Sequence, residues 1–281
     1  MNPHYQLLAD RRQQDLPARA KAIRRNVLRM AMGSGQGYVG QGLGVADVLA
    51  ALYFGEIRYD AKDPEWAERD RFLLSTGHYS IALFGALAEA GVLPLDELDT
   101  YGADGSRLEM STLESTPGVE LTGGSLAHGL GVGCGLALGL RLAGSSSRVF
   151  VLLSDGELQE GATWEAAMFA PYHALGNLTA LIDVNRTQAD GDLGAVLEVE
   201  PVAERLRSFG WWAIDVDGND VRAVSEALRD AGAQGGVPRA LVCHTRLGSG
   251  VPFIMERERA HFVRVDDDEW GRAMAQLEEG A

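Results

Sequence analysis

Two short loops carry the oxygen-bearing side chains with which this chain could bind a metal ion. The first reads SDGELQEG over residues 154–161 and follows the apolar run RVFVLL, and the second follows LTALIDV and contains Asn185. Asp155 and Asn185 are compact oxygen donors, and the backbone carbonyl of Thr187 is a candidate third ligand. Mg²⁺ and Ca²⁺ prefer oxygen ligands, and Mg²⁺ typically combines few protein ligands with phosphate oxygens. The two loops therefore suit a divalent cation that bridges to a diphosphate.

The other residues of the first loop bear on the same site. Gly156 lets the backbone approach a ligand closely, and the amino end of the following helix is expected to face an anion. Glu157 and Glu160 are more carboxylates than a phosphate site needs, so one of them is expected to have another task. Zinc is not indicated, because no Cys/His cluster has the required spacing. An Asp-Gly pair after a strand also fits an ordinary turn, so the pair of loops is the stronger signal.

The elements that must position these loops alternate along the second half of the chain. Strands are expected at 148–154, 178–184, 211–218 and 239–245, with helices at 162–175, 201–210 and 220–232. Apolar strands that alternate with helices predict an α/β fold, in which helices flank both faces of a parallel sheet. Ligands bind at the carboxyl ends of the strands in such sheets. Both loops should therefore open on the same edge of the sheet.

The first part of the chain reads as mainly helical. A helix is expected to begin at Pro17 and continue to about residue 32, and the six glycines of 33–44 should end it. Further helices are expected over 45–57 and 79–91, because apolar residues recur there at helical spacing.

The ends of the chain and the absence of a linker bear on domain organisation. The charged tail from Arg257 is expected to pack on a partner or to be mobile. Within the chain, the glycine-rich run 126–142 also reads as a helix. No stretch has the composition of a linker between domains. Residues 1–281 are therefore expected to form one domain with a helical N-terminal segment.

The composition of the chain argues against some classes of binding partner. The chain of 281 residues has a net charge of −15, which argues against nucleic acids and anionic membranes as ligands. The N-terminus lacks the apolar core of a signal peptide, and His128 and Arg141 interrupt the most apolar run, so no membrane association is expected. Cys134 and Cys243 lie far apart in apolar surroundings. They predict two buried free thiols and a cytoplasmic location.

Several motifs, taken in order, resemble those of transketolases. SDGELQEGATWEAAMFA followed by NLTALIDVNRTQADG is similar to the thiamine diphosphate signature of that family. DRFLLSTGHYS, TPGVELTGGSLAHGLG and GSGQGYVGQGLG resemble further family segments, and together the motifs cover most of residues 20–261. The resemblance implies a thiamine diphosphate-binding fold of the diphosphate-binding (PP) type. It also implies transfer of a two-carbon ketol unit from a ketose donor to an aldehyde acceptor.

The resemblance assigns roles to individual residues. Asp155, Asn185 and the Thr187 carbonyl would ligate Mg²⁺ or Ca²⁺, and Glu160 would belong to a carboxylate network between two cofactor sites. The cofactor-binding set that we expect is His78, Gly124, Leu126, Asp155, Gly156, Glu157, Glu160 and Asn185. The residues expected to orient substrate hydroxyls or to move protons are His78, His261 and Gln36.

What the chain lacks implies a partner. Transketolases are more than twice this length, and the glutamate that protonates the aminopyrimidine lies in a second domain that no segment here matches. The resemblance therefore implies a separate C-terminal subunit with a pyrimidine-binding domain, in an α₂β₂ heterotetramer. Gln36 replaces a family histidine, another falls near Met110, and Leu247 replaces a lysine. These departures suggest a non-standard sugar or sugar-like substrate from specialised metabolism.

Two other interpretations stay open. A subunit of a thiamine-dependent 2-oxo acid decarboxylase or dehydrogenase would share the metal motif, although the Trp-Glu-Ala of ATWEAA favours transketolase. A non-catalytic scaffold subunit would keep the fold alone, and the intact Asp155 and Asn185 pair argues against it.

Overall fold

The central element is a five-stranded parallel sheet, seen in a computed structural model that describes residues 15–257, 260–264 and 266–280. The strands lie in the order β2-β3-β4-β8-β7. Their bounds are β2 Arg71–Leu74, β3 Val149–Ser154, β4 Leu178–Val184, β7 Trp212–Asp217 and β8 Arg239–His244. The parallel sheet confirms the predicted class. Of these five strands the sequence predicted four and missed β2, which at four residues is too short to show a pattern.

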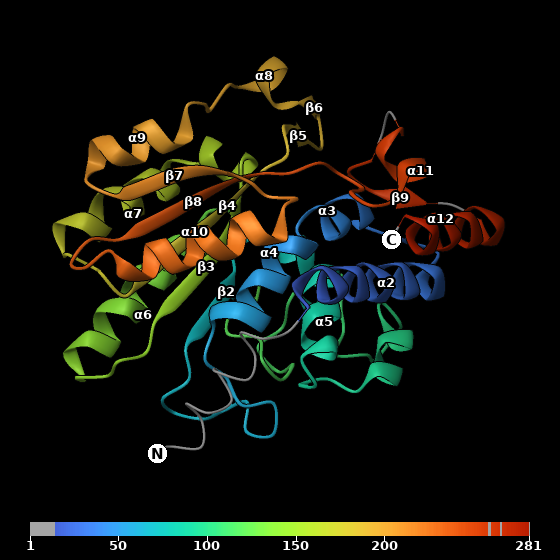
Figure 1. Ribbon diagram of the computed structural model, residues 1–281, viewed down its shortest axis with the longest axis horizontal. Coiled ribbons are helices and arrows are strands. Elements are labelled where there is room, and N and C mark those ends of the chain that lie inside the picture. The colour runs from blue at the N-terminus through green and yellow to red at the C-terminus, as the bar shows by residue number, and fades with distance from the viewer. Residues whose placement is uncertain (1–14, 258–259, 265, 281) are drawn as a thin grey trace.

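Helices cover both faces of the sheet (Figure 1), so its inner strands β3, β4 and β8 are buried on both sides. One face is covered by α6 (His128–Leu142), α7 (Gly161–Tyr172) and α9 (Val202–Phe209). The other is covered by α10 (Val221–Ala233), α4 (Ala46–Ala51), α5 (Ser80–Glu89) and α2 (Leu16–Ser34). Side chains alternate along β3: Val149 and Val151 face the helices α6, α7 and α9, and Phe150 and Leu152 face the helices on the opposite side.

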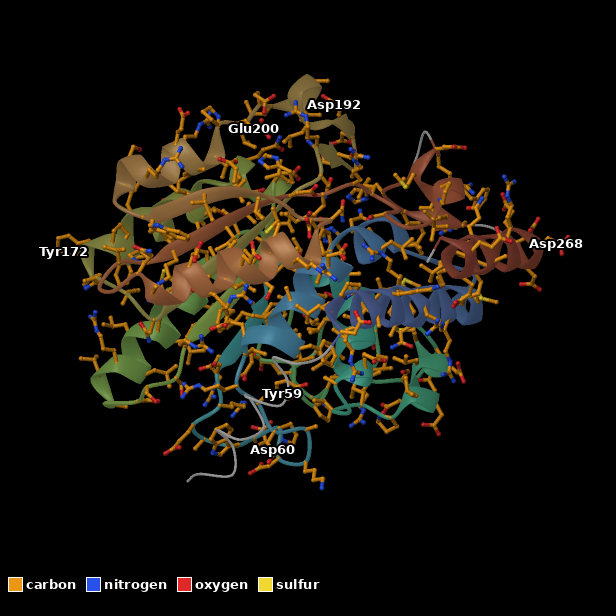
Figure 2. The ribbon with its side chains drawn as sticks, in the orientation of Figure 1. Tyr59, Asp60, Tyr172, Asp192, Glu200 and Asp268 are labelled. Atoms are coloured by element: carbon orange, nitrogen blue, oxygen red, sulfur yellow. The ribbon has the colours of Figure 1, made fainter. Side chains whose placement is uncertain are left out.

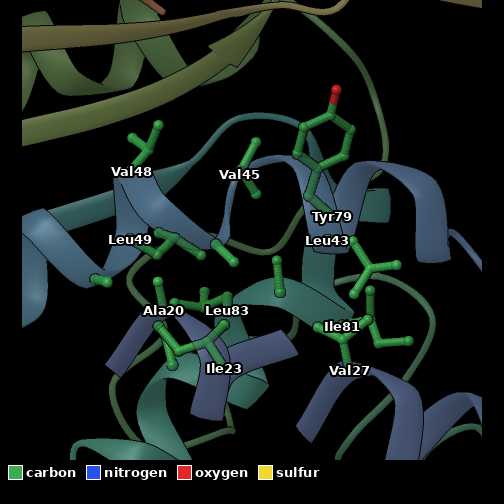
Figure 3. Close-up of a cluster of buried hydrophobic side chains, with 14 of the residues drawn as sticks. Ala20, Ile23, Val27, Leu43, Val45, Val48, Leu49, Tyr79, Ile81 and Leu83 are labelled. Atoms are coloured by element: carbon green, nitrogen blue, oxygen red, sulfur yellow. The ribbon is translucent and has the colours of Figure 1, made fainter. Parts of the chain in front are cut away.

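The helical layer around α2 forms the larger core. Figure 3 shows Ile23 and Val27 of α2 directed toward a cluster that includes Leu49 and Ile81. Asp15 caps α2 by accepting a hydrogen bond from the Ala18 amide, and Gly35, with φ of 68°, ends it, as the sequence predicted.

Half of the glycine-rich segment after α2 is helical, which corrects the expectation of a simple break. Residues Val39–Gly44 form α3, which runs into α4 and then into the π-helical turn η1 (Leu52–Glu56). A Cβ on Gly40 would lie 2.5 Å from the carbonyl oxygen of Ala260. Glycine is therefore present here to let α3 approach the segment before β9, and not to end a helix.

Residues 267–279 of the charged tail fold against their own chain, which corrects the expectation of a mobile tail, while packing on a partner stays a prediction. Helix α12 (Asp267–Glu279) follows α11 (Pro252–Met255) and packs along α2 (Figure 1). Trp270 is fully buried in this contact. The overlooked signal was a capping box, in which Asp266 and Glu269 bond each other's backbone amides.

Short elements complete the fold around the carboxyl edge of the sheet. Strand β1 (Gln36–Gly37) pairs antiparallel with β9 (Val263–Arg264), and β5 (Thr187–Gln188) pairs with β6 (Gly191–Asp192). The remaining helices are α8 (Leu193–Val196) and the 3-10 turns η2 (Gly77–Tyr79), η3 (Leu95–Thr100) and η4 (Gly156–Gln159). No helix within the described ranges is both long and apolar enough to cross a membrane.

Candidate active site at the carboxyl edge of the sheet

A cleft of about 370 Å³ opens where β3 and β4 end. The segments after β2, β3 and β4 all contribute to it, as the parallel-sheet argument predicted. The site residues predicted from the sequence that line this cleft are His78, Gly124, Leu126, Asp155, Gly156, Glu160, Thr187 and His261. The fold therefore brings together residues from distant parts of the chain, such as His78 and His261.

Asp155 is a buried carboxylate whose hydrogen-bond donors, among the described residues, are all backbone amides. Its Oδ1 accepts from the Gly156 amide at 2.8 Å and its Oδ2 from the Arg186 amide at 2.7 Å. Within the described residues, no lysine or arginine side chain forms an ion pair with it. Burial, and then the nearby Asp183 carboxylate, raise the pKa of Asp155 to about 7. A divalent cation would remove this cost, because a buried charge is stable only when paired or coordinated.

Asn185 is held in one orientation by residues that the sequence argument did not select. Its Nδ2 donates to Asp183 Oδ2 at 2.7 Å and to the Tyr79 hydroxyl at 3.0 Å, while its Oδ1 accepts from the Thr187 amide. The Tyr79 hydroxyl in turn donates to Asp183 at 2.7 Å. Figure 3 shows that hydroxyl directed away from the apolar cluster. Alternation along β4 could have indicated Asp183, because it lies two residues before Asn185.

Glu157 lies behind the wall of the cleft and does not line it. The side chain is fully buried and accepts hydrogen bonds from Ser75 Oγ, from the Ala127 amide at 2.8 Å and from the Ser154 amide at 3.0 Å. Burial raises the pKa of Glu157. Its position ties the ends of β2 and β3 to the segment before α6. Of the two glutamates, Glu160 is exposed and reaches the cleft.

The backbone around the cleft is packed closely at two loops. A Cβ on Gly123 would lie 2.4 Å from the Cα of Gly77, so the loop that carries Gly124 contacts the turn that carries His78. Gly156 differs, because a Cβ there would have its nearest neighbour at 3.7 Å, the Ser154 hydroxyl. Gly156 is the first residue of the 3-10 turn η4, and α7 follows from Gly161, one residue before the start that the sequence predicted.

Two histidines and a tyrosine form the outer wall of the cleft. The rings of His78 and His261 stack with centroids 5.6 Å apart, and Tyr38 lies 4.8 Å from His78 and 5.6 Å from His261. Burial, and then His261, lower the pKa of His78 to about 4, and burial lowers the pKa of His261. Both imidazoles are thus neutral at physiological pH and can accept a hydrogen bond. Tyr38 was missed from the sequence, where only its glycine-rich surroundings were informative.

Gln36, like Glu157 and Asn185, is a predicted site residue that does not line the cleft. It lies on β1, and its Oε1 accepts a hydrogen bond of 2.8 Å from Arg264 Nε on β9. Its side chain is therefore engaged with an arginine at the rim, two residues before Tyr38.

The donor atoms at the carboxyl edge fit a hard cation better than zinc. The candidate ligands are a carboxylate, a side-chain amide and a backbone carbonyl, all of them oxygens, which suit Mg²⁺ or Ca²⁺. Among the residues that the structure describes, no group of three or more His, Cys, Asp or Glu residues could hold a metal on its own. Further oxygens would have to come from a ligand such as a diphosphate.

Comparison with known proteins assigns the chain to a family. Residues 17–278 match the family model of the transketolase thiamine diphosphate binding domain. An uncharacterized transketolase family protein of Sinorhizobium fredii is 52% identical over 267 residues, covering 94% of this chain and 96% of that protein. A 6-deoxy-6-sulfo-D-fructose transketolase subunit of Clostridium sp. strain MSTE9 is 36% identical over 269 residues, covering 95% and 98%.

A solved structure agrees. The transketolase of Campylobacter jejuni superposes with a TM-score of 0.88 at 27% identity, over 94% of this chain and 42% of that one. The chain thus spans less than half of that enzyme but nearly the whole of the subunit relative. The chain therefore belongs to the transketolase family of transferases and has the extent of its thiamine diphosphate-binding domain.

Proposed function

We propose that this chain is the diphosphate-binding subunit of a split transketolase, which transfers a two-carbon ketol unit from a ketose donor to an aldehyde acceptor. The observation that carries the proposal is the cleft that gathers Asp155, Gly156, Thr187 and the histidine pair at one edge of the sheet. The same chain matches a transketolase subunit over nearly its full length. A subunit of a 2-oxo acid enzyme and an inactive scaffold remain the alternatives that the assay below tests.

Asp155, Asn185 and the carbonyl of Thr187 would hold Mg²⁺ or Ca²⁺, and Gly156 would let a diphosphate approach the backbone. When bound, thiamine diphosphate supplies the carbanion chemistry that cleaves and forms bonds next to a carbonyl. The protein side of this site is preset, because hydrogen bonds to Asp183 and Tyr79 fix the Asn185 amide. Such outer partners typically contribute strongly to metal affinity.

His78 and His261 would act on the substrate. Their neutral rings face the same cleft as Asp155 and lie against Tyr38. A neutral imidazole can accept a hydrogen bond from a sugar hydroxyl and hold its proton on a ring nitrogen. These two residues would thus orient hydroxyl groups and exchange protons with them. Gln36 would contribute from the rim through Arg264 and not by direct contact in the cleft.

A partner subunit would cover the exposed apolar face of α6 and α7. Large apolar side chains stand exposed there, and Figure 2 shows Tyr172 projecting from the end of α7. The exposed side chains of this face are Val132, Leu142, Met168, Phe169 and Tyr172. Leu126 and Glu160, which line the cleft, directly precede these helices, so a partner on this face reaches the cleft. We propose that residues 1–281 form one domain and that two copies assemble with two pyrimidine-binding subunits as α₂β₂.

The substrate is proposed to be an unusual sugar, handled in the cytoplasm. Gln36 stands where the family motif has histidine, and a relative of 36% identity is named for a sulfonated sugar. Both cysteines are free and buried, which suits a reducing compartment.

The test is an assay of this chain together with a separate pyrimidine-binding subunit, thiamine diphosphate and Mg²⁺. Ketose donors, including sulfonated and phosphorylated sugars, are compared with 2-oxo acids. Ketol transfer by the mixture, and none by either chain alone, is expected. Turnover of 2-oxo acids only would support the decarboxylase alternative, and absence of thiamine diphosphate binding by calorimetry would support the scaffold.

Assembly with the partner subunit is tested with one interface variant and one matched control variant. Met168→Glu places a charge within the exposed face and should prevent formation of the complex in analytical ultracentrifugation. Leu95→Glu changes an equally exposed apolar residue, 50% against 51%, on η3 outside this face and should not. Equal assembly of the two variants would remove α6 and α7 as the interface.

A further inference from the structure

The cleft continues outward into a second hollow of about 680 Å³. The two share Tyr38, Thr187, Gln188, Ala189 and His261, and the outer one adds Phe262 and the acidic tip of the β5–β6 hairpin. Figure 1 shows this hairpin and the segment that carries β9 at the same end of the molecule. A substrate whose reactive end lies near His78 would therefore extend its far end toward Phe262.

A continuous row of side chains leads from the cleft to an arginine at this rim. The ring of Phe262 meets that of Tyr38 edge to face at 5.0 Å, and the guanidinium of Arg264 lies 5.4 Å from the centre of the Phe262 ring. Val263 between them is buried. Alternation along β9 thus places Phe262 and Arg264 on the same exposed side.

Arg264 is fixed in position but keeps its charge available. Gln36 lies opposite it in the β1–β9 ladder and binds its Nε at 2.8 Å. Glutamine is neutral, so this bond orients the guanidinium without neutralising it, and the terminal N–H groups remain for another acceptor. Among the described residues, no carboxylate forms an ion pair with Arg264, whereas Arg257 and Arg186 pair with glutamates.

We propose that Arg264, oriented by Gln36, forms a subsite for the anionic end group of the sugar substrate, either a phosphate ester or a sulfonate. This inference rests on the transketolase function proposed above and names the substrate class of that site. A guanidinium fork matches the oxygens of a tetrahedral anion and binds two of them at once. In a chain of net charge −15, an oriented arginine beside the cleft gives the substrate a defined direction.

The test uses the complex of both subunits with thiamine diphosphate and Mg²⁺. Each anionic donor, one phosphorylated and one sulfonated, is compared with a neutral ketose. Arg264→Gln should raise KM for the anionic donors by roughly 10- to 100-fold, the value of a hydrogen bond to a charged group, and leave kcat and the neutral donor nearly unchanged. Arg264→Lys should retain part of the effect. The two donors show which anion the subsite prefers, and the same variants assayed against acceptors show which substrate it holds.

Arg272→Gln is the matched control. Arg272 is also exposed and lies 5.2 Å from a phenylalanine ring, that of Phe253, but on α12 away from the cleft. It should behave like the native protein. Gln36→Glu should mimic Arg264→Gln, because a carboxylate at that position would pair with the guanidinium and occupy it.

A second readout does not depend on turnover. The ³¹P resonance of inorganic phosphate should broaden on addition of the native complex and broaden less with Arg264→Gln, but not less with Arg272→Gln. An active complex in which Arg264→Gln leaves the KM of anionic donors and of anionic acceptors unchanged would overturn the subsite while the transketolase function stands. A complex with no ketol transfer that still distinguishes the variants in the phosphate spectrum would overturn the function alone.

Discussion

The two edges of the central sheet both bury carboxylates, and they treat them in opposite ways. At the amino edge, Asp70 precedes β2 and accepts from the guanidinium groups of Arg58 and Arg148, at 2.8 and 2.7 Å. Burial alone would raise the pKa of Asp70, but these arginines outweigh it and lower the pKa. At the carboxyl edge, the donors that Asp155 and Asp183 have among the described residues are all neutral, and the pKa values of both are raised.

The difference separates structure from function. Asp70 is balanced by cations of the chain itself, so its edge joins β2 to β3 and needs nothing more. The carboxyl edge concentrates negative charge that no lysine or arginine of the described residues balances, which favours a bound cation. Burial of a carboxylate does not by itself indicate a ligand site, since both edges show it. The informative feature is the absence of a paired cation among the described residues.

The largest effect is expected from removing a cation that pairs with Asp70 at the amino edge. Arg148→Met leaves Asp70 and Glu56 without their shared arginine, and the free energy of unfolding should fall by about 3–5 kcal/mol, as for other broken buried pairs. Urea unfolding measures this. Thiamine diphosphate affinity of the folded fraction should not change, and a loss of affinity without loss of stability would erase the distinction between the edges.

At the carboxyl edge the same kind of change should act on binding. Asp155→Ala removes the candidate metal ligand, and the affinity of the complex for thiamine diphosphate with Mg²⁺ should fall by roughly 100-fold or more. The free energy of unfolding should change by no more than about 1 kcal/mol, because relief of the buried charge offsets two lost amide hydrogen bonds. Calorimetry and urea unfolding check the two halves. Unchanged affinity would show that Asp155 is structural.

The edges should also respond to pH with opposite signs. The folded pKa of Asp155, about 7, exceeds its ordinary 3.8, so the folded state holds a proton that the unfolded chain has released. Without metal, stability should therefore fall as pH rises from about 4 to 7, by on the order of 3 kcal/mol. Asp70, whose pKa is lowered, contributes stability above pH 3.8 that is lost as pH falls further.

Urea midpoints over a pH series separate these contributions. Mg²⁺ with thiamine diphosphate should abolish the decline between pH 4 and 7, because the metal replaces the proton. A decline that persists in Asp155→Ala would have another source.

The smallest effect concerns the groups that orient Asn185. Tyr79→Phe removes the hydroxyl that bonds Asp183 and Asn185, and metal affinity should fall about 10-fold, as for other outer partners of metal ligands. Tyr53→Phe is the control, since Tyr53 is also buried but lies beside Asp70 at the amino edge. Equal affinities for Tyr79→Phe and Tyr53→Phe would contradict a positioning role for Tyr79.

The sequence predicted the sheet and the two loops because local patterns encode them. Apolar runs mark β3, β4 and β8, and Asp155 and Asn185 stand directly beyond two of them. It could not predict Tyr38 or Tyr79, because their roles depend on segments that come together only in the folded chain. The helix in the tail was not predicted, because the high charge of this segment suggested a mobile tail although Asp266 forms a capping box.

Gln36 shows the limit of transferring a role by position. The motif placed it among residues that act on the substrate, and the structure directs its side chain to Arg264. A single substitution can thus change which neighbouring residue a side chain contacts, and the sequence alone does not indicate the new contact.

The most direct test of the account is a crystal structure of this chain with its partner subunit, thiamine diphosphate and Mn²⁺ in place of Mg²⁺. The anomalous signal of manganese locates the metal without assumption. We expect it bound by the Asp155 carboxylate, the Asn185 side-chain oxygen and the Thr187 carbonyl, with the diphosphate beside Gly156. A metal held elsewhere, with Asp155 still bonded only to its backbone amides, would contradict the account.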